Sequence, residues 1–390
     1  MPTITQVNVI GAHKALFDIA GTADNPIEKV ILTYADGKSS EYHSDPVPVT
    51  PLPSQPPPEF DNYWRPDWIE SPAQPAITRV RQASPANFKS VWQSRARGDE
   101  IQLLRGQVYD LKALIGNKLE IDKNDMRLSA FGDGAPPLLT WGGAYCVLSV
   151  SSARVEVVGI DLKSLNPVRQ ATGGAWISGK DVRLLKMNIH AAGEHCFNIR
   201  PSARRVELNQ CANTGKVAGY FCYANGGDLS LINCTSDKVG LYGYRANTCG
   251  DQYLAGCTFI GSNPTTPSSI CMIADVTRAA VVASRFVNTA LATGPNMDIN
   301  GFNQADPDGT DDEKYAALLA KTSEDVDLRD VAFEKGATLT IGYGSVNVRA
   351  NGVKGDPRIV VKPDGYLPVN GKKYKQPAAK DVTIDGKRWA

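Results

Sequence analysis

From residue 155 onward the chain repeats one short apolar pattern, which restricts the possible fold more than any other feature. The pattern is Φ-x-Φ-x-x-Φ-x-Φ, where Φ is mostly apolar, and its copies begin at Val155, Val182, Val206, Leu229, Gln252, Ala279, Val326 and Val346. The steps between copies are 27, 24, 23, 23, 27, 47 and 20 residues. We interpret the step of 47 as two coils, the first of which carries Met297, Ile299 and an insertion.

Each copy predicts two short strands joined by a bend. Alternation every second residue is the period of a strand, and the two-residue skip in the middle marks the bend. A strand-bend-strand unit that recurs about every two dozen residues is one turn of a β-solenoid. We expect one interior ladder formed by Val157, Leu184, Leu208, Leu231, Leu254 and Val281. A further strand precedes each copy, at 145–150, 175–178, 195–200, 219–223, 240–245, 269–275 and 296–300.

The eight cysteines have two interpretations. They lie at positions 146, 196, 211, 222, 234, 249, 257 and 271, and an even number allows a disulfide framework. However, Cys211, Cys234 and Cys257 occupy one ladder position at steps of 23. Free cysteine behaves as a small buried hydrophobe, whereas a metal site needs converging ligands. We therefore favour stacked core thiols and expect no metal there.

Two further segments precede the repeat. Residues 84–97 predict a helix that covers the open end of the solenoid, with Ser84 as N-cap and with Phe88, Val91 and Trp92 on one face. Residues 1–45 predict a small β-sandwich-like module, with strands at 5–10, 15–19, 29–35 and 39–43. Residues 46–83 are a proline-rich linker whose Phe60, Tyr63, Trp64 and Trp68 pack on the solenoid wall or on a neighbouring subunit. The solenoid is expected over 84–355 and an irregular tail over 356–390.

The start of the solenoid resembles a known family. Asn87–Tyr109, with its helix followed by GDEIQLLRGQVYDL, and Leu119–Gly134 are similar to the first coils of pectate-lyase-like β-helix proteins. The resemblance covers roughly residues 84–355 and implies an all-β fold, a right-handed single-stranded parallel β-helix. The superfamily includes polysaccharide lyases, hydrolases, epimerases and bacteriophage tailspikes, and the fold does not decide among them. The tailspike resemblance also implies a homotrimer.

Bulk properties exclude some functions. The formal net charge is +1, so nothing predicts electrostatic capture of nucleic acid. No apolar run reaches the roughly 18 residues of a membrane span. The N-terminal sequence has no basic stretch followed by an apolar one, so we expect a virion or extracellular location without a cleaved signal peptide.

The strands at 195–200, 219–223 and 240–245 carry the candidate binding residues. A period of 23 would stack Asn198, Phe221 and Tyr244 in one outward ladder, and Arg200 with Tyr223 in the next. Together with the turn residues Asn225 and Asn247 they form a strip suited to a polysaccharide, because aromatic faces cover sugar rings and amide or guanidinium groups bind their polar substituents. The alternative is an aromatic ladder that only stabilises the stack.

The candidate catalytic residues are Arg200, His195 and Glu194. β-Elimination needs a base and a cation that neutralises the sugar carboxylate, which Arg200 or His195 would supply. Hydrolysis needs two carboxylates, here Glu194 with Asp228 or Asp237. His190 and Arg204 complete the predicted cluster. The run Arg200-Pro201-Ser202-Ala203-Arg204 differs in spacing from the Arg-x-Pro-x-x-Arg motif of pectate lyases.

Residues 304–324 interrupt the repeat with an acidic turn and a predicted short helix. Asp306, Asp308, Asp311 and Asp312 are candidate calcium ligands, or alternatively partners of the helix N-terminus.

Three functions remain open from the sequence. The first is a bacteriophage tailspike or virion appendage that binds, and possibly depolymerises, a bacterial surface polysaccharide, with residues 1–45 attached to other virion proteins. The second is a free polysaccharide lyase or hydrolase. The third is a non-catalytic structural or decoration protein of a virion.

Overall fold

The computed structural model describes residues 29–33, 39–43, 63–168, 171–237, 239–261, 270–289, 295–301, 321–363, 365–369 and 372–390. The chain divides into two compact units, Met1–Asn62 and Tyr63–Ala390. The described part of the first unit is an antiparallel pair, β1 (Lys29–Thr33) and β2 (Ser39–His43), where the sequence predicts its third and fourth strands. The other two predicted strands of this unit, Phe60, and the four candidate calcium ligands lie outside the described residues.

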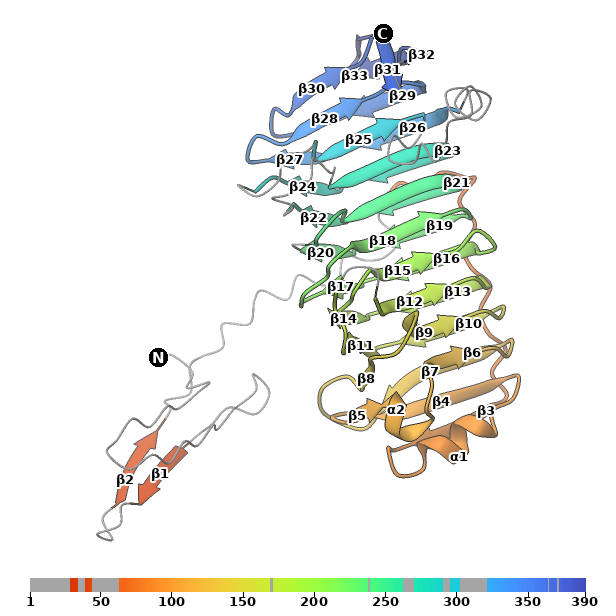
Figure 1. Ribbon diagram of the computed structural model, residues 1–390, viewed down its shortest axis with the longest axis vertical. Helices are drawn as coiled ribbons and strands as arrows, with labels where there is room; N and C mark the ends of the chain where they lie inside the picture. The colour runs from red at the N-terminus through yellow and green to blue at the C-terminus, as the bar shows by residue number, and fades with distance from the viewer. Residues whose placement is uncertain are drawn as a thin grey trace. The chain divides into compact units, whose positions relative to one another are not determined.

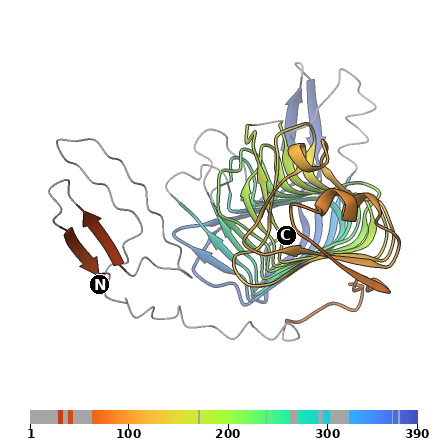
Figure 2. The same ribbon diagram turned by 90° about the horizontal axis from the view of Figure 1, so that it is seen from below.

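The second unit is a right-handed parallel β-helix whose coils have three faces (Figures 1 and 2). Face A contains β6 (Leu119–Ile121), β9 (Cys146–Val150), β12 (Gly173–Ile177), β15 (His195–Ile199), β18 (Tyr220–Asn225), β25 (Met297–Asn300), β28 (Thr338–Ile341) and β30 (Arg358–Val361). Face B contains β3 (Arg79–Ala83), β4 (Asp99–Leu104), β7 (Met126–Phe131), β10 (Val155–Val158), β13 (Lys180–Leu185), β16 (Arg204–Asn209), β19 (Leu229–Ile232), β26 (Ser323–Arg329), β29 (Ser345–Asn351), β33 (Lys380–Ile384) and β34 (Lys387–Arg388). The long strands β21 (Tyr244–Ala255) and β23 (Cys271–Val282) run through the corner and belong to both faces, which joins A and B into one sheet of 21 strands.

Face C is a separate sheet of nine strands. It contains β5 (Val108–Asp110), β8 (Leu138–Trp141), β11 (Asp161–Ser164), β14 (Asn188–Ala191), β17 (Ala212–Asn213), β20 (Thr235–Asp237), β22 (Thr258–Ile260), β24 (Arg285–Val287) and β27 (Ala332–Glu334). The chain passes through the faces in the order A, B, C. The solenoid pairing runs from Arg79 to Ile384, which is longer at both ends than the range expected from the repeat.

The predicted interior ladder is confirmed on face B. Val157, Leu184, Leu208, Leu231, Leu254 and Val281 are register partners on successive coils, and all are buried. Two details of the repeat were wrong. Ala279 pairs directly with Val326, so the step of 47 is one coil with an insertion between β25 and β26. Val348, not Val346, continues the ladder position of Val326, because the last step is 22 residues.

The two-residue skip in the middle of each repeat copy is a backbone bend, and its conformation is the same from coil to coil. The residue between face B and face C has a positive φ on every coil from β10 to β29: Gly159, Lys186, Gln210, Asn233, Gly256, Ala283, Asp330 and Gly352. A single left-handed residue turns the strand sharply while both neighbours keep extended geometry. The sequence pattern therefore marks this corner even where the residue is not glycine.

All eight cysteines are buried free thiols. Cys211, Cys234 and Cys257 each direct a thiol to a carbonyl oxygen of the preceding coil, those of Leu184, Leu208 and Leu231 respectively. This confirms the prediction of stacked core thiols, and it excludes the disulfide framework.

The open N-terminal end of the core is covered by α1 (Phe88–Gln93), whose Phe88, Val91 and Trp92 are buried as predicted. The predicted N-cap was wrong. Asn87 occupies that position without a side-chain cap, because Ser84 starts a preceding turn in which its amide donates to Asn87 Oδ1 at 2.7 Å. A second short helix, α2 (Leu111–Leu114), is capped by the carboxylate of Asp110.

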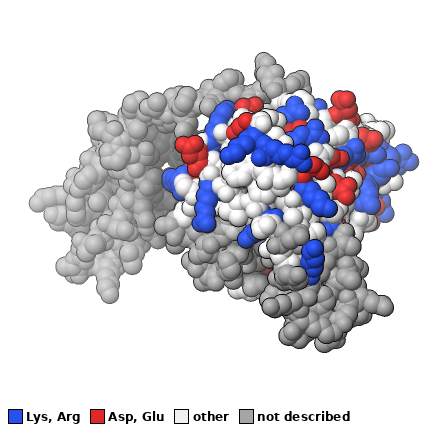
Figure 3. Space-filling model, turned by 90° about the horizontal axis from the view of Figure 1, so that it is seen from above, with Lys and Arg blue, Asp and Glu red and all other residues white. Residues whose placement is uncertain are grey.

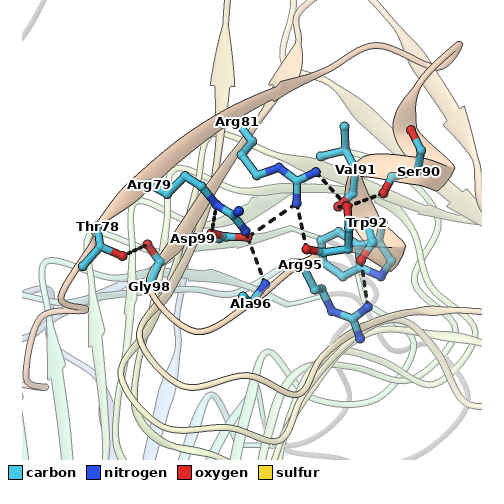
Figure 4. Close-up of polar contacts among 11 residues, drawn as sticks. Thr78, Arg79, Arg81, Ser90, Val91, Trp92, Arg95, Ala96, Gly98 and Asp99 are labelled. Atoms are coloured by element: carbon cyan, nitrogen blue, oxygen red, sulfur yellow. Dashed lines mark hydrogen bonds and ion pairs between the residues drawn. The ribbon is translucent and has the colours of Figure 1, made fainter.

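A buried carboxylate fixes the cap to the first strands (Figure 4). Asp99 accepts two hydrogen bonds from Arg79 at 2.7 Å and one from the amide of Ala96 at 2.9 Å. Burial alone would raise the pKa of Asp99, but these hydrogen bonds and the charges of Arg79 and Arg81 outweigh it and hold the pKa below its ordinary value. Arg81 also donates to Ser94 just after α1, so one ionic cluster joins β3, β4 and the helix.

The segment from Tyr63 to Thr78, here called the strap, runs along the outside of face B from the later coils to the first (Figure 1). Tyr63 donates to Asn233 Oδ1 at 2.9 Å, and Tyr253 donates to the carbonyl of Trp64 at 3.1 Å. Trp68 and Ile69 pack with Tyr63 on the apolar cluster Ile232, Tyr253, Ala255, Ala280 and Val282. The prediction that linker aromatics pack on the solenoid wall is confirmed for Tyr63, Trp64 and Trp68.

Pairs of opposite charge line the corner where face B begins. Asp125 pairs with Arg154, Asp181 with Arg205 and Asp251 with Arg278, each on adjacent rungs of one ladder. The strap joins this ladder, since the amides of Ala73 and Ala76 donate to Asp181 and Asp125. Among the described residues, the structure contains no helix with the length and apolar character of a membrane span.

Candidate functional site: an aromatic and cationic surface on face A

The outside of face A carries a ladder of large polar and aromatic side chains. Trp176, Asn198, Tyr223 and Arg245 are register partners on β12, β15, β18 and β21, and they alternate with the buried residues of each strand. His195 pairs with Tyr220 beside this ladder, at the start of β15 and β18. We call these residues, together with Tyr145, Glu194, Arg200 and Tyr242, the aromatic face.

Arg245 organises one half of the aromatic face. Its guanidinium lies 5.2 Å from the ring centroid of Tyr242, 5.6 Å from that of Tyr223 and 5.9 Å from that of Tyr220, and its Nη1 donates to Tyr220 Oη at 3.2 Å. The imidazole of His195 stacks on Tyr220 and Tyr223 at centroid distances of 5.0 and 5.2 Å. Arg245, Tyr220 and His195 are buried, whereas Tyr223 and Tyr242 are half-buried. The result is a rigid floor with partly exposed rings above it.

The other half is built on Trp176. The guanidinium of Arg200 lies 5.0 Å from its ring centroid, and Tyr145 meets the same ring edge-on at 5.6 Å. Beside these rings is an open hollow of about 610 Å³. Its lining comprises Gly142, Gly143, Ala144, Tyr145, Asn166, Ala171, Thr172, Trp176 and Glu194. Arg200 and Tyr145 are exposed, so this half is accessible from solvent.

Burial and charge keep His195 neutral. Burial, together with the positive charges of Arg200 and Arg245, lowers the pKa of His195 to about 3. Burial raises the pKa of Tyr220, which the nearby charge of Arg245 opposes. The aromatic face therefore combines uncharged rings with two arginines and Glu194.

Three polar atoms of the outer ladder have no hydrogen-bond partner among the described residues. They are Trp176 Nε1, Asn198 Oδ1 and Arg245 Nε. Buried polar atoms without partners are rare in proteins and are found at functional sites. The surface thus offers stacking faces together with donors and acceptors, which is the combination that binds sugars.

Some of the predicted binding residues lie on the outside of face A, and others face the core. Asn198 and Tyr223 face outward, Arg200 is exposed beside Trp176, and Asn225 pairs with Asn247 in the next ladder, at the end of β18.

The outward orientation predicted for Phe221 and Tyr244 was wrong. Both are fully buried, and Tyr244 belongs to the interior ladder of Cys222. The reason is the spacing. Asn198 and Tyr223 are 25 residues apart, and Tyr223 and Arg245 are 22 apart, so the predicted period of 23 does not apply to these coils of face A.

The predicted catalytic cluster is only partly brought together. Glu194 and His195 adjoin β15, and Arg200 follows it. His190, however, points out from face C, where its Nε2 lies 2.8 Å from Asp161 Oδ2. Arg204 donates to the carbonyls of Pro201 and Ala203 at the start of face B. Including His190 and Arg204 was wrong, because a corner of the coil separates each from His195.

The carboxylate pairs proposed for hydrolysis are also separated. Asp228 lines another hollow, beneath the strap on face B, together with Arg205 and Arg278. Asp237 lies at the end of β20 on face C, where its backbone bonds to Asn213. Among the described residues, no three His, Cys, Asp or Glu side chains converge as metal ligands.

Sequence reasoning missed Tyr145 and Trp176. The strand at 175–178 was predicted from the sequence, but its outward aromatic residue, Trp176, was not aligned with Asn198. The usable signal is the pair of small residues Gly173 and Gly174 before Ala175, which marks a close approach of backbone on one side and leaves Trp176 as the outward side chain.

Comparison with known proteins supports the fold. No protein-family model matches the chain, and no curated relative is detected from its sequence. An alginate lyase from Paenibacillus sp. str. FPU-7 superposes with a TM-score of 0.56 at 10% identity, over 73% of this chain and 98% of that one. A rhamnogalacturonan lyase gives 0.53 at 10% identity over 73% and 84%. The GH136 lacto-N-biosidase from Eubacterium ramulus gives 0.51 at 10% identity over 78% and 68%.

Proposed function

We propose that the chain binds a polysaccharide on the aromatic face. One observation carries the proposal: four successive coils present Trp176, Asn198, Tyr223 and Arg245 in one outward ladder, flanked by Arg200 and Tyr242. Aromatic rings cover the apolar face of a sugar, and guanidinium groups bind its hydroxyl or carboxylate oxygens. The spacing of adjacent coils, about 4.8 Å, suits a chain of linked sugars better than one small ligand.

Proteins with the same fold and sugar substrates in their names support this proposal at the level of fold. We further propose that the protein is a homotrimeric bacteriophage tailspike or other virion appendage, attached through residues 1–45. The proposal rests on the layout of the chain: a small β module expected over residues 1–45, a spacer with seven prolines at 45–58, and a long solenoid. Light scattering that gives the mass of three chains supports it, and a stable monomer contradicts it.

Binding fits the geometry better than cleavage does. A base works best when its pKa lies near the working pH, and His195, with a pKa of about 3, is a weak proton acceptor. A lyase reaction is the second candidate, because Glu194 lines the hollow and Arg200, which lies over the ring of Trp176, offers a cation for a sugar carboxylate.

The experiment is a panel of bacterial capsular and exopolysaccharides tested by affinity electrophoresis. Binding that is lost in Trp176→Ala and kept in Lys163→Ala, an exposed residue on face C, supports the aromatic face as the site. Ultraviolet absorbance of unsaturated sugars and an assay of reducing ends then separate binding from cleavage. Unsaturated product that disappears in Arg200→Ala or Glu194→Ala supports the lyase reaction, and its absence on a polymer that binds contradicts it.

A further inference from the structure

The C-terminal end of the solenoid is an open, basic edge. The last strand of face A, β30, pairs with β28 through Arg358–Val361, and no described strand pairs with its other side. Ile359 and Val361 are only partly buried, although they continue the interior ladders of Leu339 and Ile341. On face B, in contrast, the end strand β33 is covered by β34.

The pairing geometry identifies the unpaired backbone groups. The amides of Arg358 and Lys362 donate to the carbonyls of Ala337 and Ile341 on the preceding coil. Because successive residues of a strand direct their amides to opposite sides, the N–H and C=O groups of Ile359 and Val361 face the open edge. Such an edge is a template for one more strand.

The C-terminal segment that contains this edge is basic in sequence. Residues 349–390 contain ten Lys or Arg and four Asp, a net charge of +6 in a chain whose total is +1, and two of these cations are paired, Lys354 with Asp330 and Arg388 with Asp381. Arg358 and Lys362 bracket β30 itself. Two of the acids are engaged within this end, since Asp381 pairs with Arg388 and Asp385 accepts the amides of Gly352 and Val353. Figure 3 looks onto this end and shows an uncharged area bordered by Lys and Arg, with Asp and Glu among them.

A second copy of the chain is a less complementary occupant. At the N-terminal end of the solenoid, Asp99, Asp122 and Asp125 already pair with Arg79, Arg81, Arg95 and Arg97, so these carboxylates are engaged. An acidic occupant is complementary to the edge.

We propose that the open edge of β30 accepts an extended acidic segment of a partner protein as an added strand. Main-chain hydrogen bonds to Ile359 and Val361 supply the pairing, and Arg358, Lys362 and the surrounding cations select acidic side chains. This interaction is independent of polysaccharide binding, because it uses backbone at the end of the solenoid rather than the side chains of β12 to β21.

The test uses the full chain and an acetylated, amidated peptide of alternating Glu and Val, with a Lys-Val peptide as its matched control. Anisotropy measures affinity, and hydrogen exchange measures protection of residues 358–362. We expect the Glu-Val peptide to bind and to protect the amides of Ile359 and Val361, and the Lys-Val peptide to do neither. Val361→Pro removes one edge donor without cutting the ladder to β28, so it weakens binding at least tenfold.

Charge reversal at Arg358 and Lys362 transfers the preference to the Lys-Val peptide, whereas reversal of Lys163 on face C has no effect. Ile359→Pro replaces Val361→Pro if circular dichroism shows that the latter unfolds. Binding without protection of β30, binding that both proline variants retain, or no binding of the acidic peptide overturns the proposal. Inorganic polyphosphate that binds with equal affinity and leaves β30 unprotected indicates charge capture alone and also overturns it.

Discussion

The guanidinium of Arg200 lies 5.0 Å from the ring centroid of Trp176, on the neighbouring coil of face A. A cation held over an aromatic ring gains about 0.5–2 kcal/mol and fixes the orientation of both side chains. Here it fixes an exposed arginine beside the hollow that Trp176 and Glu194 line. The pair therefore links the rigid ladder of the solenoid to the accessible part of the candidate site.

Phe221 and Tyr223 should respond in opposite ways to truncation. Phe221 is fully buried and meets Phe197 edge-on at 5.4 Å, so Phe221→Ala is expected to cost about 3–5 kcal/mol of unfolding free energy. Tyr223 is half-buried on the outer ladder, so Tyr223→Ala should lower polysaccharide affinity at least tenfold with a smaller loss of stability. Urea unfolding and affinity electrophoresis of both variants measure this. Equal losses of stability would contradict the assignment of the two sides.

His195 should make stability depend on pH between about 6.5 and 3. Its folded pKa of about 3 lies below the ordinary value, so the unfolded chain takes up a proton that the folded chain refuses. Stability is then lost as pH falls through this window, by about 1.4 kcal/mol per unit. His195→Gln removes this contribution. Urea midpoints at pH 7, 6 and 5 should fall less steeply in the variant than in the parent protein, and parallel slopes would refute the buried neutral state.

Asp125 should contribute strongly to the free energy of unfolding at neutral pH. Hydrogen bonds from Arg154, helped by Arg97 and the amide of Ala76, hold its pKa well below the ordinary value in spite of burial. Its stabilisation is present above the unfolded pKa of about 3.9 and is lost as pH falls toward the folded pKa. Asp125→Asn is expected to cost about 3 kcal/mol at pH 7 and less below pH 4. Asp122→Asn is the control, because Asp122 is exposed and pairs with Arg95, and its loss should stay within about 1 kcal/mol.

The cysteines should be unreactive in the folded protein. All eight are buried, and burial raises the pKa of Cys249 to about 11 and that of Cys146 to about 12, so the reactive thiolate is scarce at pH 8. A thiol reagent such as a disulfide dye should label all eight only after unfolding in urea. Rapid labelling of any one thiol in the native state would show that its coil opens.

Face B was predictable from the sequence because each of its coils has the same length between the apolar positions and the corner. Val157 and its partners repeat through a left-handed residue that fixes the bend, so spacing alone gives their register. Face A was less predictable. The connections from face C to face A vary in length. Tyr223 therefore joins the outer ladder of Asn198, whereas Tyr244 joins the interior ladder of Cys222 and not the predicted outer one.

Which side chains of the candidate site face outward depends on the length of these connections. The sequence therefore predicted the side correctly for some of them and wrongly for others. Asn198 and Tyr223 were assigned the correct side, whereas Phe221 and Tyr244 were not. The packing of Arg245 among three tyrosines and the position of Trp176 depend on contacts between coils whose offset is not constant. A local pattern within one strand does not contain that offset.

The most direct test of the account is the affinity of the purified chain for bacterial surface polysaccharides, with Trp176→Ala as the matched variant. We expect at least one polymer to bind and the variant to lose at least tenfold in affinity while it stays folded, with a loss of unfolding free energy of about 2 kcal/mol or less. Binding that the variant retains, or no binding to any polymer that the host displays, would contradict the aromatic face as a polysaccharide site.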